Sequence, residues 1–128
     1  MITVSAERVR KKARIDDTYD ADIQETIDEH IPYIESKIRD IYLNSEDNNI
    51  KSIINLGATE IITGEFIKEQ ANDEEDGVSL GVGPIKISDN SVVKTRSTRA
   101  QNFIDSGWEK LKPYLKATNV FYFASVEG

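Results

Sequence analysis

Residues 20–43, DADIQETIDEHIPYIESKIRDIYL, decide the expected fold. Isoleucines recur there at steps of three and four, at Ile23, Ile27, Ile31, Ile34, Ile38 and Ile41. This spacing is the 3.6-residue period of a helix with one apolar face, and most other positions are charged or polar. Asp20 is the expected N-cap, and Pro32 predicts a kink because proline removes a backbone hydrogen bond. The stretch should therefore form the spine of a small helical domain.

The residues before this stretch predict a short helix. Ser5 can cap a helix that runs to about Arg14, with Val9 and Ala13 facing inward. The acidic segment from Asp16 to Tyr19 then has the composition of a turn.

A second long helix is expected over roughly Ile50–Ala71, with Asn48 or Asn49 as its cap. Its apolar face carries isoleucines and small residues together. Small side chains let a neighbouring helix approach closely, and this is the expected role of Gly57, Ala58 and Gly64.

The pattern changes to a period of two after Gly77. Apolar residues alternate on both sides of Gly83-Pro84, at Val78, Leu80, Val82, Ile85 and Ile87. Alternation bounded by turn residues predicts a β-hairpin within residues 78–94, which Val92 and Val93 could extend.

A last helix should begin at Ser97 or Thr98 and end near Lys112, because Pro113 follows. Residues 118–128 form an apolar tail that favours a strand through Val120, Phe121, Tyr122 and Phe123. An unpaired strand of this kind tends to aggregate, so it should pair with the hairpin or with another chain.

These elements predict a mainly α fold in one domain, residues 1–128. We expect a small bundle of three to four helices, a β-hairpin insert before the last helix and a strand-like C-terminal tail. Of the 128 residues, 38% are apolar and 30% charged, as in soluble globular proteins. The sequence has no cysteine, no leader pattern and no apolar run of membrane-spanning length, so we expect neither disulfides nor membrane insertion.

Charge is distributed unevenly along the chain, whose net charge is −7. Residues 1–14 carry five basic groups and one acidic group, whereas residues 15–47 carry two basic and eleven acidic groups. Complementary charge of this kind can steer copies of one chain together, although a merely solvated surface explains it equally well. Sequence-specific duplex binding is disfavoured, because it needs a concentrated basic face.

Motifs for catalysis, metals or cofactors are missing from the sequence. His30 is the only histidine and has no glutamate three or four residues before it, so a metal role would need carboxylates from elsewhere in the fold. Gly77, Gly81 and Gly83 lack the Gly-Lys-Ser/Thr ending of a phosphate-binding loop. We therefore expect no enzyme, no cofactor and no metal.

The order of elements resembles the head–tail connector (adaptor) proteins of tailed bacteriophages, prophage copies included. The likeness lies in Val4–Arg10 as a short first helix, in the Asp16-Asp17 turn and in a long helix that ends in Ile41-Tyr42-Leu43. It continues in the Gly77–Ser88 insert and in the helix that ends in Leu111-Lys112-Pro113-Tyr114-Leu115.

The resemblance implies a structural protein of the virion neck, present in the host cytoplasm before assembly. It would form a ring of about a dozen copies below the portal, extend the DNA channel and bind the next neck or tail protein. DNA would pass without sequence-specific binding. The expected contact residues are the apolar positions of the hairpin and tail, and the basic flank of Lys94, Arg96 and Arg99.

Two other functions remain open. The chain could be a cellular helical module that binds a protein partner or acts as a small regulator. It could also be a nucleic-acid regulator that uses the basic residues of 94–116.

Overall fold

The computed structural model describes residues 1–75 and 86–116, with the side chains of residues 1–70 and 97–116. This part of the chain is mostly helical and contains no strand or sheet. Its elements, in chain order, are α1 (Ala6–Ala13), the 3₁₀ turn η1 (Asp17–Tyr19), α2 (Asp20–Lys37), α3 (Asp40–Leu43), α4 (Asn48–Glu75), α5 (Lys86–Leu111) and the 3₁₀ turn η2 (Lys112–Tyr114).

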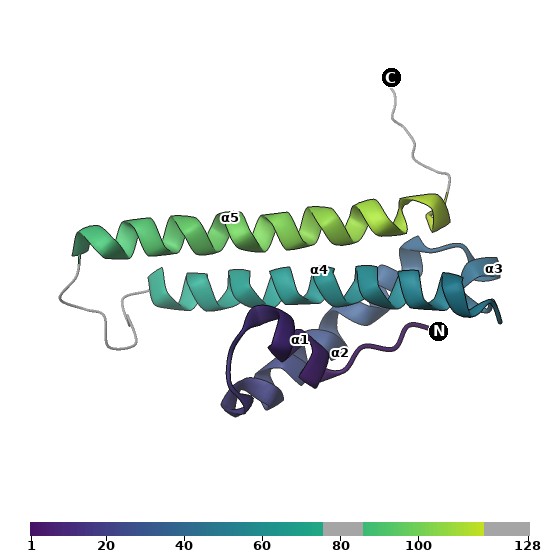
Figure 1. Cartoon of the computed structure of the whole chain (residues 1–128), viewed down its shortest axis with the longest axis horizontal. Helices are drawn as coiled ribbons and strands as arrows, with labels where there is room; N and C mark the ends of the chain where they lie inside the picture. The colour runs from purple at the N-terminus through teal and green to yellow at the C-terminus, as the bar shows by residue number, and fades with distance from the viewer. Residues whose placement is uncertain (76–85, 117–128) are drawn as a thin grey trace, which may run out of the picture.

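Helix α4 lies at the centre of the molecule. Helix α5 runs antiparallel beside it along most of its length, and α1 and α2 pack against its other side (Figure 1). The fold is mainly helical, as expected, but the described residues form five helices and not three to four, and the central helix is α4 and not the isoleucine-rich stretch.

The isoleucine stretch is broken into two helices. Helix α2 continues through Pro32 and ends at Lys37, and Ile38 is extended, with φ −101° and ψ 140°. Ile23, Ile34 and Ile38 are fully buried, as predicted, whereas Ile41 on α3 is 67% exposed. The prediction of one continuous helix to Leu43 was therefore wrong, and its apolar stripe does not extend to Ile41.

The caps of α1 and α4 explain where these helices begin. The Ser5 hydroxyl accepts a hydrogen bond from the Arg8 amide at 3.2 Å, so the predicted cap is confirmed. Asp47 caps α4, since its carboxylate accepts from the amides of Asn49 at 2.8 Å and Ile50 at 3.3 Å. Asn48 is therefore the first residue of α4 and not its cap.

Three glycines set the close approach of α4 and α5. A Cβ on Gly64 would lie 2.5 Å from the Ala100 carbonyl oxygen and 2.6 Å from Ile104 Cγ1. A Cβ on Gly107 would lie 2.5 Å from the carbonyl oxygen of Gly57. Real Cβ atoms do not come so near to other atoms. At these glycines the backbones of α4 and α5 therefore occupy the space that side chains would fill at an ordinary helix contact. The prediction of close packing at Gly57 and Gly64 is confirmed, and Gly107 is their partner on α5.

The predicted hairpin was wrong. Helix α5 begins at Lys86, eleven residues before the expected start at Ser97, and includes Ile87, Val92 and Val93. The alternation of Ile85 and Ile87 covers too few residues to separate a strand from a helix. Val93 also precedes Ala100 and Ile104 at helical steps of seven and four, so these residues continue the helix that packs on α4. Residues 78–85 of the predicted hairpin, and the predicted tail at 118–128, lie outside the described residues.

The end of α5 was predicted correctly. The helix stops at Leu111, and Pro113 lies in the 3₁₀ turn η2 that follows. No helix in the described part of the chain is long and apolar enough to cross a bilayer.

Candidate functional site

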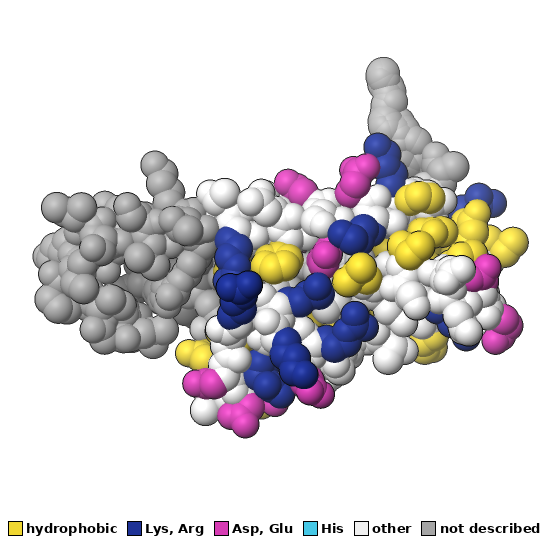
Figure 2. Space-filling view, in the orientation of Figure 1, with side chains coloured by type: hydrophobic (Ala, Val, Ile, Leu, Met, Phe, Trp, Pro, Cys, Tyr) yellow, Lys and Arg dark blue, Asp and Glu magenta, His cyan; other side chains and the backbone are white. Residues whose placement is uncertain are grey.

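Hydrophobic side chains gather at one end of the molecule, where α3 meets η2 (Figure 2). Ile41 is 67% exposed, and the rings of Tyr42 and Tyr114 meet edge to face at 5.0 Å. We call Ile41, Tyr42, Leu43, Tyr114 and Leu115 the apolar end surface. The exposed isoleucine and the partly buried aromatic rings offer apolar area that a protein partner could cover.

A short backbone bridge holds this surface together. Ile38 and Leu115 form an isolated antiparallel β-bridge. The Arg39 amide donates to the Tyr114 carbonyl at 3.0 Å, and the Lys116 amide donates to the Lys37 carbonyl at 2.9 Å. The break between α2 and α3 therefore exists because the chain after α5 supplies the partner for an extended Ile38.

Basic side chains gather over α1 (Figure 2). Arg8, Lys11 and Arg14 are exposed and Lys12 is partly exposed, and we call these four residues the basic α1 surface. Lys11 pairs with Glu7 at 3.0 Å, but both side chains are largely solvated, so this pair adds little stability. The surface carries a positive field next to the acidic helix α2.

Helix α2 carries the opposite charge. Asp22, Glu25, Asp28 and Glu29 are all exposed on it, and we call them the acidic α2 surface. One ion pair joins the two helices, since Arg10 Nε lies 2.9 Å from Asp20 Oδ1. The uneven charge of the sequence thus becomes two neighbouring surfaces of opposite sign.

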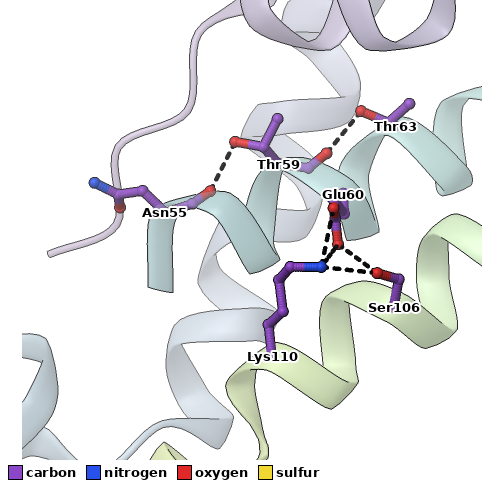
Figure 3. A network of polar contacts seen from close by, with 6 residues as sticks. All are labelled: Asn55, Thr59, Glu60, Thr63, Ser106 and Lys110. Carbon is purple, nitrogen blue, oxygen red and sulfur yellow. Dashed lines mark hydrogen bonds and ion pairs between the residues drawn. The ribbon is translucent and has the colours of Figure 1, made fainter. Parts of the chain in front are cut away.

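A polar network crosses the interface between α4 and α5 (Figure 3). Lys110 Nζ lies 3.0 and 3.2 Å from the two carboxylate oxygens of Glu60 and 2.9 Å from Ser106 Oγ. Ser106 donates to Glu60 at 2.8 Å. A catalytic serine–lysine pair needs a neutral amine to take the hydroxyl proton. Here the ammonium faces both oxygens of a carboxylate, which is the geometry of a structural ion pair.

A second polar cluster joins α2 to α4. His30 Nε2 lies 3.9 Å from Glu29 Oε1 and 3.9 Å from Glu69 Oε2. The three side chains can offer ligand atoms that all lie within 4.8 Å of one another, so they could hold a metal ion. Burial raises the pKa of the Glu69 carboxyl, and the nearby Glu29 and Glu65 charges act in the same direction.

The residues expected to bind partners fall into three groups. Ile87 and Lys94, which were expected in the hairpin, lie in α5, and so does Arg96 of the basic flank. Arg99 is partly buried, donates from Nη2 to the Lys12 carbonyl at 3.0 Å and lies over the Phe103 ring. It therefore ties α5 to α1 inside the molecule. The other predicted contact residues, Val78, Leu80, Val82, Ile85, Val120, Phe121, Tyr122 and Phe123, lie outside the described residues.

Sequence reasoning missed the apolar end surface and both polar groups. Ile41 was placed on the buried stripe, and its exposure follows from the break at Ile38. Glu60 and Glu69 each pair with a residue of another helix. The two partners of each pair lie far apart in the sequence, so only knowledge that these distant positions are in contact would have revealed the pairs. Comparison with protein families, with curated proteins and with solved structures finds no match to this chain.

Proposed function

We propose that the protein is a non-enzymatic structural adaptor of a viral neck, a head–tail connector that assembles with copies of itself on a portal. The apolar end surface carries this proposal, because it offers an unshielded isoleucine beside a rigid bridge. Burial of one isoleucine side chain contributes about 1.5–3 kcal/mol, and such anchors dominate protein interfaces. In an assembled neck, the portal or the next neck protein covers this surface.

The two charged surfaces support contact between copies. Basic α1 and acidic α2 lie side by side on one subunit. A ring needs a heterologous contact, in which one surface of a subunit meets a different surface of the next. The basic α1 surface of one copy and the acidic α2 surface of its neighbour supply such a pair. An acidic surface left facing the channel would repel DNA and let it pass freely.

The resemblance behind this proposal keeps part of its basis. The short first helix, the acidic turn and the ending of the last helix are present as α1, η1 and η2. Two parts of the likeness differ: residues 86–88 of the expected hairpin belong to α5, and the long helix expected to end in Ile41-Tyr42-Leu43 ends at Lys37. The likeness thus rests on the order of helices.

A single added charge tests the apolar end surface. Ile41→Asp should abolish recruitment to portal-containing particles, counted as copies per particle by electron microscopy. Asn44→Asp is the matched control, because it adds one negative charge at an exposed position just after α3 and should leave recruitment unchanged. Equal copy numbers for Ile41→Asp and the unaltered protein would remove the apolar end surface from the mechanism.

A truncation tests the expected role of the tail separately. Removal of the residues after Ala117 should reduce the copies per particle, because this segment carries Val120 to Phe123. Normal occupancy by the truncated protein would exclude the tail from portal binding.

A cellular interaction module is the second candidate, and the same apolar end surface favours it. Neighbouring genes distinguish the two. Genes for portal, capsid and tail proteins beside this one support the adaptor, whereas an isolated gene among metabolic genes supports the cellular module.

A further inference from the structure

The cluster formed by Glu29, His30 and Glu69 has the donor set of a metal site. An imidazole nitrogen and two carboxylate oxygens come from two helices, α2 and α4, with His30 Nε2 at 3.9 Å from each oxygen. Ligands of tetrahedral zinc, at about 2.0–2.1 Å from the ion, lie about 3.3 Å apart. Both glutamates are exposed and the ligand atoms lie within 4.8 Å of one another, so rotations of the two glutamate side chains would have to bring them onto the ion. The imidazole distinguishes the cluster from an ordinary acidic patch.

A buried hydroxyl lies beside one ligand. Thr26 is 2% exposed, and its Oγ1 lies 3.2 Å from Glu69 Oε1 and 3.2 Å from the Asp22 carbonyl oxygen, so its single proton is shared between these two acceptors. The other oxygen, Oε2, is the one that faces His30. Metal-binding carboxylates are commonly held in this way by an outer hydrogen bond, which leaves the second oxygen for the ion.

The charges at the cluster also fit a dication. Glu29 and Glu69 bring two negative charges, and Glu65 is close enough to act on Glu69. Among the residues whose side chains the structure describes, no lysine or arginine forms an ion pair with Glu29 or Glu69. Glu29 and Glu69 carry like charges beside one half-buried histidine, and a bound dication would relieve the repulsion between them.

We propose that Glu29, His30 and Glu69 bind a divalent transition-metal ion, Zn²⁺ in the first instance, which links α2 to α4. Imidazole favours zinc and its neighbours in the first transition row over Mg²⁺ and Ca²⁺. Three protein ligands leave one position of a tetrahedral ion for water. The site goes beyond the adaptor function, because it links two helices within one subunit, and it shares Glu29 with the acidic α2 surface.

The single histidine makes the site directly observable. In a proton NMR titration of the whole protein with ZnCl₂, the only imidazole signals should shift and saturate at one ion per chain. The midpoint of thermal unfolding should rise by roughly 5–10 °C at a hundredfold excess over Kd. MgCl₂ at the same concentration should change neither signal. Zinc that left the imidazole signals unchanged would overturn the proposal.

Variants assign each ligand. Glu69→Gln should weaken zinc binding by about a hundredfold, and Thr26→Val should weaken it roughly tenfold by releasing the Glu69 carboxylate. Glu25→Gln, which removes an exposed carboxylate from the same helix, is the control and should bind zinc as the unaltered protein does. His30→Gln should bind no zinc at this stoichiometry, and if this variant fails to fold, the Glu69→Gln titration decides. Unchanged affinity in Glu69→Gln would show adventitious binding and end the proposal.

Discussion

The two sides of helix α4 are packed by opposite means. Toward α2 the interface is filled by large branched side chains, and Ile23 and Ile34 are both fully buried. Toward α5 it depends on missing side chains, since Gly57, Gly64 and Gly107 bring the two backbones together. The interface with α2 therefore depends on large side chains that fill it, and the interface with α5 depends on residues that have no side chain. Truncation should harm one side, and enlargement should harm the other.

Ile34→Ala should give the largest effect, on the side filled by isoleucines. Removal of a fully buried isoleucine side chain leaves a cavity, and the free energy of unfolding should fall by about 3–4 kcal/mol in urea denaturation. Ile41→Ala is the control, because Ile41 is 67% exposed and should change stability by less than about 0.5 kcal/mol. Similar losses of stability at both positions would contradict the argument that burial decides how much each isoleucine contributes to the free energy of unfolding.

Gly64→Ala tests the glycine side. Its Cβ would meet the Ala100 carbonyl oxygen at 2.5 Å, and a backbone atom cannot move aside cheaply. Overpacking costs about 1–3 kcal/mol, and the better helix propensity of alanine offsets about 1 kcal/mol, so we expect a net loss of about 1 kcal/mol, and about 2 kcal/mol at most. Gly57→Ala should cost less, since its two shortest contacts are to the movable Leu111 side chain. A gain in stability from Gly64→Ala would contradict the overpacking argument, because it would mean that α4 and α5 can move slightly apart without a cost in free energy.

Lys110→Met tests the polar network on the same interface. The Glu60 side chain is only 12% exposed, and without the ammonium it keeps one hydroxyl partner. The loss should be about 1 kcal/mol, because Lys110 itself is about one-third exposed and water screens the pair. The double variant Glu60→Gln with Lys110→Met should recover part of this loss in a double-mutant cycle. Lys112→Met, at an exposed position one residue beyond α5, is the control.

Thr18→Val should have the smallest effect, at the turn that joins α1 to α2. Hydrogen bonds from the Thr18 hydroxyl and amide lower the pKa of the Asp16 carboxyl. A lowered pKa contributes stability above the unfolded value, and this contribution is lost as the pH falls through the folded pKa. The variant should bring the pKa of Asp16 back toward its ordinary range in a carbon NMR titration. Thr3→Val, which changes an exposed threonine away from the turn, is the control.

The sequence predicted the features that depend on local pattern. The stripe of Ile23 to Ile38, the Ser5 cap and the stop before Pro113 all follow from spacing and residue type, and the structure contains them. The break at Ile38 could not be predicted in this way, because its cause is a bridge to Leu115 at the other end of the chain. The hairpin failed for a related reason. The alternation of Ile85 and Ile87 is too short to separate a strand from a helix, and the backbone from Lys86 onward belongs to α5.

The candidate site was less predictable than the fold. Glu69 completes the histidine cluster from a different helix, and no spacing rule connects it to His30. Likewise, Ile41 carries the same side chain as the buried isoleucines, and only the chain direction after Lys37 brings it to the surface.

The bridge between Ile38 and Leu115 also gives the molecule a mechanical property. Two hydrogen bonds accompany it, and they join Tyr114 and Lys116, near the C-terminal end of the described residues, to Arg39 and Lys37 at the junction of α2 and α3. A force that pulls on the chain beyond Lys116 therefore acts on this bridge first, before the force can unwind α5. A pull from a bound neighbour would thus be felt first at the junction of α2 and α3, which carries the exposed Ile41.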